Sequence, residues 1–532
     1  MKQVLAAMAV LAACARVPVE GETSAARSQE PTLAILEAPL PDIAEALASG
    51  AVSSEGLTRG YLDRIEKIDR AGPTLQAVLT VNPDALNDAK ASDARRAAGR
   101  LLGALDGVPV LIKDNIETKD PMPTTAGSLA LKDNFTGRDS PLVAGLRAGG
   151  AIILGKTNLS EWANFRSEDS VSGWSGLGGQ TRNPHMLDRS PCGSSSGSGA
   201  AMAASLAAGT VGTETNGSII CPSSVNGVVG FKPSVGLVSQ QYIAPISPSQ
   251  DAAGPMTKTV EGAAMMLAAM DEADTDYARG LDKGALAGKK VAVLRFAQGP
   301  NADVKALFER AIDDLKKAGA TVVEIEKFDP GEKFWADARM VLDYEFKAAI
   351  NAYLAEAAPM VTARSLDDLI AFNKQHADVE LAIFDQSIFE KAAPLGDLAT
   401  PGYVSAREAV QRAAGPEGID RLLRESGADV LVAPSGPVSS RVDPINGDVW
   451  PPWAGAGYLA AIAGTPHLTV PMGAVDAIPV GLSFIGAKGT DAAILGYGFA
   501  YEQISQRRVD PQYLRDAEDL AIIKAAMRRK AD

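Results

Sequence analysis

Two glycine- and serine-rich runs embedded in apolar sequence constrain this chain more than any other feature. The first, residues 192–199, leads directly into the alanine-rich stretch 200–208, which predicts a helix that Gly209 stops. The second, residues 212–218, leads into apolar residues that belong in a core. Flexible linkers share this composition, but core-forming segments do not flank them in this way. Glycine runs at helix starts let backbone N–H groups point at an anion or an oxyanion, so we expect a site built from backbone here.

Short apolar strands alternate with helices along most of the chain. Residues 41–70 carry apolar side chains at helical spacing, and residues 290–326 predict a strand–helix–strand unit. Further strands are expected at residues 107–112, 429–433, 467–470 and 480–485. This alternation predicts an α/β fold in which helices cover both faces of a sheet.

The composition is that of an ordinary globular protein with an acidic balance. Of 532 residues, 46% are hydrophobic and 22% are charged, which excludes a disordered chain and a small disulfide scaffold. The 51 lysines and arginines are outnumbered by 65 aspartates and glutamates, which gives a net charge of −14. This surplus of negative charge argues against nucleic acid, or an anionic membrane surface, as the main partner.

The first residues are typical of a bacterial signal peptide. A short basic start precedes ten apolar residues, Val4 to Ala13, which would span only about 15 Å as a helix, half of a membrane's hydrocarbon core. The sequence LAAC ending at Cys14 resembles a lipobox, in which the cysteine is lipidated; ordinary cleavage one residue later and an alanine-rich helix start are the alternatives. We expect residues 1–14 to direct export and residues 15–35 to form a tether. The protein would then be periplasmic, or a lipoprotein with a lipid anchor at Cys14.

Cys192 and Cys221 are the cysteines left once Cys14 is set aside. In an exported chain they could form a disulfide. Their small-residue surroundings suit buried free thiols equally well, and sequence spacing leaves both states open.

A serine nucleophile needs a base, and this chain has only three histidines, His185, His376 and His467. Residues 193–197 match the pattern G-x-S-x-G, which would make Ser195 a nucleophile. That motif demands a strand immediately before it, whereas the preceding segment is interrupted by prolines. Neither run carries the lysine of a phosphate-binding loop, so a phosphate site is also disfavoured.

A lysine can serve as the base if it is neutral at working pH. Lys113 ends the apolar run Val108 to Ile112 and is followed by Asp114 and Asn115. Burial there, with cationic and dipolar neighbours, would lower its pKa by up to about 3–5 units. Most lysines at strand ends reach solvent instead, so the interpretation of Lys113 as a base depends on the motifs around it.

At these motifs the chain resembles the amidase signature family. Residues 107–115 (GVPVLIKDN) and 124–128 (TTAGS) match the family's catalytic-lysine region. Residues 179–184 (GQTRNP) and the two glycine- and serine-rich runs match its signature sequence. Several long motifs in the right order carry this resemblance.

The resemblance extends from about residue 41 to about residue 485. It implies a large mixed β-sheet covered by helices on both faces, within a single domain over residues 36–530. The signature core would occupy about residues 100–260, and a helical peripheral layer about residues 335–425.

The resemblance also implies a role for each matching residue. Ser218 would be the nucleophile, Ser194 the bridging serine after a cis peptide bond, and Lys113 the base. The oxyanion hole would be formed by the backbone N–H groups of Thr215, Asn216 and Gly217, together with that of Ser218. Water would hydrolyse the resulting acyl-enzyme, and neither a metal, a cofactor nor an obligate protein partner is implied.

Four positions depart from the common family pattern. Cys192, Ser196 and Asn216 replace frequent glycines, and Ile220 stands where arginine is frequent. None of these changes removes a catalytic side chain. Together they are most similar to the peptide amidase branch, which releases ammonia from C-terminally amidated peptides, so the implied substrate is a small-molecule or short peptide amide.

Other functions compatible with the same signature stay open. Aryl, fatty-acyl or oligoamide substrates are alternatives within the family. A glutamyl-tRNA amidotransferase subunit shares the signature but works with partner subunits and tRNA, which the leader and the acidic charge disfavour. An inactive binding scaffold would be expected to have lost Lys113, Ser194 or Ser218, and all three are present.

Aromatic and charged residues in the loops are the remaining candidates. We expect packing beneath loops, with lining of a substrate cleft as the alternative, for Trp162, Trp174, Trp450 and Trp453. We expect Arg166, Glu168 and Asp169 to be solvated loop charges, with contact to substrate as the alternative. We expect His467 to be a structural histidine.

Overall fold

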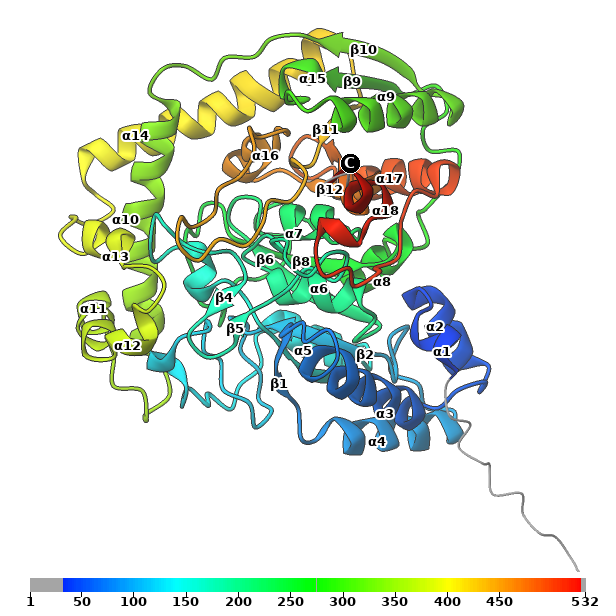
Figure 1. Ribbon diagram of the computed structural model, residues 1–532, viewed down its shortest axis with the longest axis vertical. Helices are drawn as coiled ribbons and strands as arrows, with labels where there is room; N and C mark the ends of the chain where they lie inside the picture. Colours follow the sequence, from blue (N-terminus) through cyan, green and yellow to red (C-terminus); the bar gives the residue numbers. More distant parts are fainter. Residues whose placement is uncertain (1–31, 274, 528–532) are drawn as a thin grey trace, which may run out of the picture.

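The computed structural model describes residues 32–273 and 275–527 and is built on one mixed sheet of eleven strands (Figure 1). The sheet order is β1 (Val78–Val81), β3 (Ile152–Thr157), β2 (Pro109–Lys113), β6 (Gly209–Glu214), β8 (Ala252–Thr257), β7 (Val229–Lys232), β12 (His467–Val475), β13 (Ile478–Ile485), β11 (Val430–Pro434), β9 (Lys290–Leu294) and β10 (Thr321–Ile325). Strands β4 (Trp174–Ser175) and β5 (Gly179–Gln180) form a separate antiparallel pair. The large mixed sheet expected from the sequence is confirmed.

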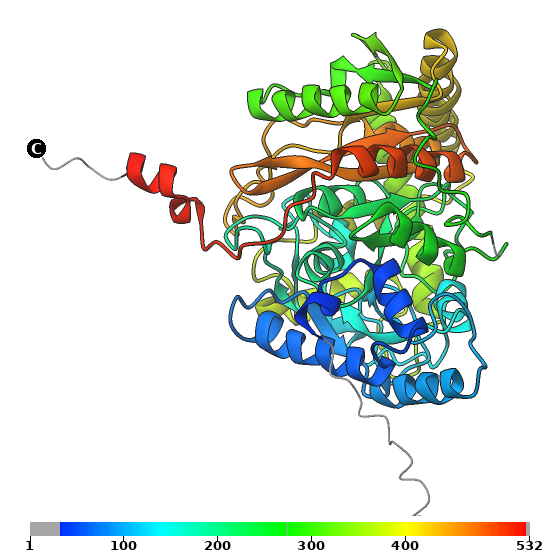
Figure 2. The same cartoon turned by 90° about the vertical axis from the view of Figure 1, so that its right-hand side faces the viewer.

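The α-helices are, in chain order, α1 (Leu33–Leu36), α2 (Leu40–Ala48), α3 (Ser54–Arg64), α4 (Ala85–Ala97), α5 (Pro141–Ala148), α6 (Ser196–Ala203), α7 (Ile220–Val225), α8 (Val260–Met270), α9 (Ala302–Lys317), α10 (Phe334–Ala355), α11 (Leu366–Gln375), α12 (Ala377–Glu380), α13 (Ser387–Ala392), α14 (Pro401–Ala414), α15 (Asp420–Ser426), α16 (Gly457–Ala463), α17 (Asp491–Ser505) and α18 (Ala521–Met527). Helices α10 to α15 form an arm along one side of the sheet (Figure 1). Figure 2 shows α18 projecting from the body near the C-terminus.

Parallel pairing is confined to two groups of strands. Strand β2 pairs in parallel with β3 and β6, and β9 pairs in parallel with β10 and β11. The strands that connect these groups, from β6 through β8, β7, β12 and β13 to β11, pair antiparallel. All five residues of β2 are buried, as expected for a strand whose sheet is covered on both faces.

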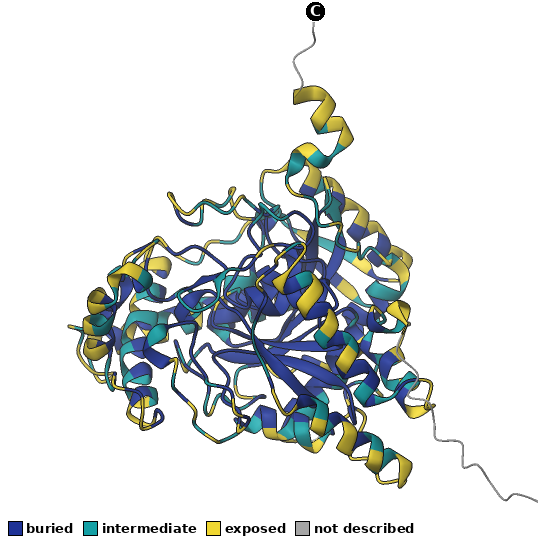
Figure 3. Ribbon diagram, turned by 60° about the horizontal axis from the view of Figure 1, so that its bottom comes forward, coloured by how far each residue is buried: buried dark blue, intermediate teal, exposed yellow. Residues whose placement is uncertain are grey.

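Helices cover both faces of the sheet, as the packing of alternate residues of β9 shows. Val291 and Val293 belong to a hydrophobic cluster that includes the apolar face of α9, whereas Ala292 and Leu294 belong to a second cluster with α10, α14 and α16. Successive side chains of a strand point to opposite faces, so the two clusters lie on opposite sides of the sheet. Figure 3 shows the buried sheet in the centre, with helices exposing only their outer sides.

The expected strand–helix–strand unit is present as β9, α9 and β10. The side chain of Asn301 caps α9 by accepting hydrogen bonds from the backbone N–H groups of Asp303 and Val304, at 2.9 and 3.0 Å. Strands β9 and β10 pair in parallel, with Val291 opposite Val322. The unit places the apolar side of α9 against the sheet.

The predicted helix over residues 200–208 is wrong in its bounds. Helix α6 begins earlier, at Ser196, and ends at Ala203, and Gly209 begins strand β6 instead of stopping a helix. The chain leaves the helix because the backbone N–H of Ala208 donates to the carbonyl of Pro109, at 3.0 Å, which brings residue 209 beside β2. The early start depends on Gly197, where a Cβ atom would lie 2.3 Å from the carbonyl oxygen of Ala77.

The leader predictions lie mostly outside the described part of the chain. Residues 1–31, including Cys14, are not described, so export and lipidation stay predictions. Helix α1 begins at Leu33, inside the segment expected to be a tether, and buries Leu36. Within the described residues, none of the helices combines the length and the apolar character needed to cross a bilayer.

Candidate active site

The candidate catalytic residues come from neighbouring strand ends and the helix starts beside them. Lys113 is the last residue of β2, and Thr213 lies near the end of the adjacent strand β6. Ser194 precedes α6, and Ser218 precedes α7. The lysine segment and the two glycine- and serine-rich runs therefore meet at the carboxyl ends of two neighbouring strands inside the sheet.

Lys113 is fully buried and held by three hydrogen-bonding partners. Its Nζ lies 2.8 Å from Ser194 Oγ, 2.8 Å from Thr213 Oγ1 and 3.3 Å from the Thr213 carbonyl oxygen. Burial lowers the pKa of Lys113 to about 7, while the charges of Asp251 and Glu214 act in the opposite direction. The lowered lysine pKa expected from the sequence is present. Its cause is burial and not the expected cationic neighbours, because the nearby charges are anionic.

Thr213 fixes the orientation of the lysine. A neutral amine has two N–H donors and one lone pair. If both donors are directed at the hydroxyl and the carbonyl of Thr213, the lone pair is left for the hydroxyl proton of Ser194. This arrangement suits a base that receives a proton from Ser194.

Ser194 follows a cis peptide bond with Gly193, as the resemblance implied. Its carbonyl accepts a hydrogen bond from the backbone N–H of Ser160, at 3.1 Å. A Cβ atom at residue 193 would lie 2.2 Å from Ser160 Oγ, so a larger residue there would displace the Ser160 side chain. Ser195, the serine of the G-x-S-x-G pattern, instead donates its hydroxyl to the Thr213 carbonyl, at 3.0 Å.

Ser218 lies in the tight turn that joins β6 to α7. Its carbonyl accepts the backbone N–H of Ser195, at 3.1 Å, which ties the two serine segments together. Gly217 has a φ of +83°, a conformation that favours glycine. The carboxylate of Glu214 accepts the backbone N–H groups of Ile219 and Ile220, at 2.8 and 3.0 Å, at the start of α7.

Cys192 and Cys221 form a disulfide, which decides between the two states left open by the sequence. One cysteine lies two residues before Ser194 and the other three residues after Ser218. Both are buried, at 5% and 3% exposure. The bond therefore joins the two serine segments covalently, in addition to the hydrogen bond between Ser195 and Ser218.

A cleft of about 510 Å³ opens beside these segments. Asn216 and Gly217 of the expected oxyanion hole line it, together with the disulfide. Its aromatic lining consists of Phe296, Trp335, Trp450, Trp453 and Tyr458. The rings meet in pairs: Trp335 and Tyr458 have centroids 4.9 Å apart, and Trp450 and Trp453 have centroids 5.9 Å apart.

The four tryptophans singled out in the sequence divide into two kinds. Trp162 and Trp174 are buried against Phe389 and Phe384, as expected for packing residues. Packing beneath loops was the wrong expectation for Trp450 and Trp453, which line the cleft. Their segment lies beside the site because it folds back between β11 and α16, a long-range placement that local composition does not reveal.

Two further expectations need correction or refinement. Arg166 is fully buried and not solvated: its guanidinium lies 3.2 Å from Glu161 and 3.7 Å from Glu380 and stacks on the ring of Phe384. His467 is buried as a structural histidine, with Nε2 2.7 Å from Ser483 Oγ, but it also forms part of the cleft wall.

Glu168 and Asp169 are both exposed, as expected. Glu168 also pairs with Arg339 and Lys391, at 2.9 and 2.8 Å.

Sequence reasoning missed residues that contact the candidate catalytic segments from elsewhere in the chain. Thr213 orients Lys113, and Asp251 contacts the expected oxyanion segment through Thr215. Phe296, Trp335 and Tyr458 belong to the cleft but carry no local motif. Only Thr213 had a signal, since it lies inside the second glycine- and serine-rich run.

Comparisons with known proteins agree on one family. The model of the Amidase family matches residues 56–495. A probable amidase of Arabidopsis thaliana is 35% identical, over 91% of this chain and 93% of that protein. The crystal structure of the native peptide amidase of Stenotrophomonas maltophilia is similar with a TM-score of 0.83 and 45% identity, over 90% of this chain and 99% of the other. A glutamyl-tRNA(Gln) amidotransferase subunit of Myxococcus xanthus is 32% identical, over 87% of this chain and 96% of that protein.

Proposed function

This chain belongs to the amidase signature family and is an amide-hydrolysing enzyme, and from this premise we propose that it removes ammonia from C-terminally amidated short peptides through Lys113, Ser194 and Ser218. The observation that carries the proposal is the buried lysine: Lys113 Nζ lies 2.8 Å from Ser194 Oγ, in surroundings that lower its pKa to about 7. A lysine with a pKa near neutrality can accept and return a proton within one catalytic cycle.

In the proposed mechanism, Ser218 Oγ attacks the amide carbonyl carbon. Its proton passes to Ser194 Oγ while the Ser194 proton passes to Lys113 Nζ, so the amine becomes an ammonium group. The tetrahedral intermediate collapses as the C–N bond breaks, and the proton returns from Lys113 through Ser194 to the leaving ammonia. Water then attacks the acyl-enzyme by the same relay, which releases the peptide acid and restores Ser218.

The backbone N–H groups of residues 215–218 support the negative charge that develops on the carbonyl oxygen. Removing one such donor from an enzyme of this kind costs about 2.7–4 kcal/mol of barrier. The left-handed conformation of Gly217 and its place in the cleft wall support this assignment.

The cleft supports a peptide as the substrate. Its volume of about 510 Å³ lies within the range of sites for drug-sized molecules, which corresponds to a peptide of a few residues. Its aromatic walls offer apolar contact to side chains that precede the carboxamide. The likeness to a peptide amidase of known structure points to the same substrate class.

A matched substrate panel tests the proposal. Ammonia release would be measured for a blocked dipeptide amide, the matching free dipeptide, an anilide and a long-chain fatty amide, with amine release as the readout for the anilide. We expect turnover of the dipeptide amide and none of the free dipeptide. Turnover of the anilide or the fatty amide alone would keep the chemistry and reject the peptide substrate. Ammonia transfer that needed glutamyl-tRNA would support the amidotransferase alternative.

Two serine variants test the catalytic assignment. Ser218→Ala is expected to abolish turnover, and Ser195→Ala is the matched control from the neighbouring run. If Ser218 is the nucleophile, Ser195→Ala retains a rate more than about 100-fold above that of Ser218→Ala. Equal loss in the two variants, or full activity of Ser218→Ala, would assign the nucleophile elsewhere.

We also propose that residues 1–14 export the enzyme and that Cys14 carries a lipid. The lipobox sequence motivates this, and the Cys192–Cys221 disulfide supports it, because such bonds persist in oxidising compartments. Labelled palmitate should enter the wild-type protein and not Cys14→Ala. Incorporation into both forms would reject the anchor, and retention of the wild-type protein in the cytoplasm would reject export.

A further inference from the structure

We propose that Asp251 is a positioning residue of this active site: its carboxylate anchors the start of the oxyanion segment through Thr215 and places a negative charge beside Lys113. The proposal rests on the catalytic assignment made above, since it gives Asp251 a function only if Lys113 is the base and residues 215–218 hold the oxyanion.

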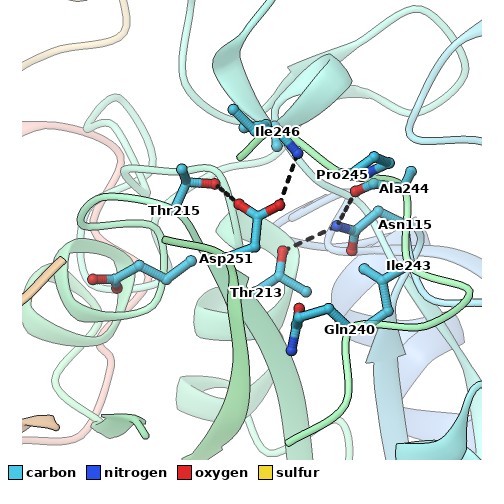
Figure 4. Close-up of a pocket in the computed structure, with 11 residues that line it drawn as sticks. Asn115, Thr213, Thr215, Gln240, Ile243, Ala244, Pro245, Ile246 and Asp251 are labelled. Atoms are coloured by element: carbon cyan, nitrogen blue, oxygen red, sulfur yellow. Dashed lines mark hydrogen bonds between the residues drawn. The ribbon is translucent and has the colours of Figure 1, made fainter. Parts of the chain in front are cut away.

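The carboxylate of Asp251 is fully occupied by three donors. Thr215 Oγ1 donates to Oδ1 at 2.6 Å, and the backbone N–H groups of Ile246 and Ser247 donate to Oδ2, both at 2.9 Å. Figure 4 shows Asp251 between Thr215 on one side and Ile246 on the other. These three donors favour the ionised carboxylate, whereas burial raises the pKa of Asp251 to about 6, so the group is charged at neutral pH.

Strand pairing places the two residues opposite each other. Thr215 directly follows β6, Asp251 directly precedes β8, and the flanking residues Glu214 and Ala252 are paired in the antiparallel register. Thr215 is also the first residue of the expected oxyanion segment. The bond from Asp251 therefore fixes that segment at the point where it leaves the sheet.

A small cavity lies between Asp251 and Thr213, the residue that contacts Lys113. It has a volume of about 20 Å³, and its lining includes Asn115, Thr213, Thr215 and Asp251. Thr213 both lines this cavity and contacts Lys113. Its Oγ1 accepts hydrogen bonds from Lys113 at 2.8 Å and from Asn115 Nδ2 at 3.0 Å. Figure 4 shows Thr213 and Asn115 facing Asp251 across this cavity.

The charges around these groups define the electrostatic effect. Asp251 and Glu214 are the carboxylates that favour the protonated form of Lys113, and so raise its pKa against the effect of burial. Glu345 of α10 faces Asp251 from the other side and accepts the Ser247 hydroxyl at 2.6 Å. Removing the charge of Asp251 would therefore lower the pKa of Lys113 further, so that the base stays neutral at more acidic pH.

The two roles can be separated because asparagine fits this site. In Asp251→Asn the amide oxygen can accept the two backbone N–H groups, and the amide nitrogen can donate to Thr215 Oγ1. The anchor is kept and the charge is lost. In Thr215→Val the anchor is lost while the carboxyl group of Asp251 stays in place, and Thr215→Ser restores the hydroxyl.

The test is the rate at which a fluorophosphonate labels the full-length enzyme, followed by intact mass between pH 5 and 9. For Asp251→Asn we expect the acidic limb of the rate profile to move to lower pH by about 1 unit. For Thr215→Val we expect a plateau at least about tenfold lower, with a substantial part of the loss recovered in Thr215→Ser.

An unmoved limb in a folded Asp251→Asn enzyme, or a plateau in Thr215→Val equal to wild type, would overturn the proposal. The Thr215 variants change no charge and decide the anchor even if Asp251→Asn fails to fold. Labelling does not require a peptide substrate, so the result is independent of the substrate panel. Wild-type enzyme that labels slowly, with no pH dependence, would instead contradict the proposed catalytic residues.

Discussion

Thr213 accepts two hydrogen bonds from Lys113 Nζ, one at its hydroxyl, 2.8 Å away, and one at its carbonyl, 3.3 Å away. In the neutral form of the amine, Thr213 can take both of its N–H donors and leave the lone pair for Ser194 Oγ, 2.8 Å from Nζ. The amine of Lys113 is therefore held by the neighbouring strand β6.

We predict that Thr213→Val slows hydrolysis without preventing folding, because valine has the same shape but cannot accept the hydrogen bond from Lys113. The kcat for a dipeptide amide should fall by about 10- to 100-fold, since loss of a buried partner costs about 1–3 kcal/mol. Thr213→Ser should recover a substantial part of the rate. Equal rates for the valine variant and the wild type would show that Lys113 does not need this contact.

The pH dependence of the wild-type enzyme should report the protonation of Lys113. Burial lowers the pKa of this lysine to about 7, and only the neutral form can accept a proton. The kcat/KM should therefore be constant above about pH 8 and fall about tenfold for each pH unit below the pKa. The same profile for Lys113→Ala, measured at high enzyme concentration, should lack this limb. A limb that persists in the variant would assign the base to another group.

We predict that Glu502→Gln stabilises the protein at alkaline pH. Glu502 is half-buried and accepts the backbone N–H of Val260 at 3.0 Å, and its partial removal from water raises its pKa to about 8. Because the folded state favours the protonated carboxyl, stability is lost as pH rises from the unfolded pKa, about 4.5, through the folded pKa.

Glutamine keeps the hydrogen-bond acceptor but does not ionise, so the variant avoids the loss of stability at high pH. The free energy of unfolding of Glu502→Gln should exceed that of the wild type by a margin that grows as pH rises, by as much as about 1.4 kcal/mol for each pH unit. Urea unfolding at pH 5, 7 and 9 checks this. A difference that does not change with pH would contradict it.

The Cys192–Cys221 disulfide should support both stability and activity. It closes a short loop, with a sequence separation of 29 residues, and replacing both cysteines by alanine should lower the free energy of unfolding by roughly 2–4 kcal/mol. Because the bond joins the segments of Ser194 and Ser218, kcat should fall as well, at a temperature where the variant stays folded. Unchanged kcat in the folded variant would limit the bond to a role in stability.

The parts of this site that could be predicted from the sequence are those in which local chemistry dictates the residue. Lys113 ends a continuous apolar run, which fixes it at the end of a buried strand. A Cβ atom at Gly193 or Gly197 would lie 2.2 or 2.3 Å from a neighbouring oxygen, so the glycine pattern marked the turn that leads into α6, although not the residue at which the helix begins. These signals are contained in a few neighbouring residues.

Contacts between distant segments could not be predicted in this way. Arg166 looks like a loop charge, yet it is buried against Glu380, a residue 214 positions further along the chain. Asp251 follows a proline- and serine-rich loop and only strand pairing brings it to Thr215. The bounds of α6 were misplaced for the same reason, because pairing of β6 with β2 overrides the helical propensity of the alanines before Gly209.

The origin of the cleft walls has a consequence for how such an enzyme diversifies. The proposed base and both serines lie between residues 113 and 218, whereas the five aromatic rings come from residues 296 to 458. Replacing the second half of the chain can therefore alter which amides are selected, while the proposed catalytic residues are unchanged. Grafting residues 435–457 from a relative into this framework is thus a route to new selectivity that leaves Lys113, Ser194 and Ser218 on their original strands and turns.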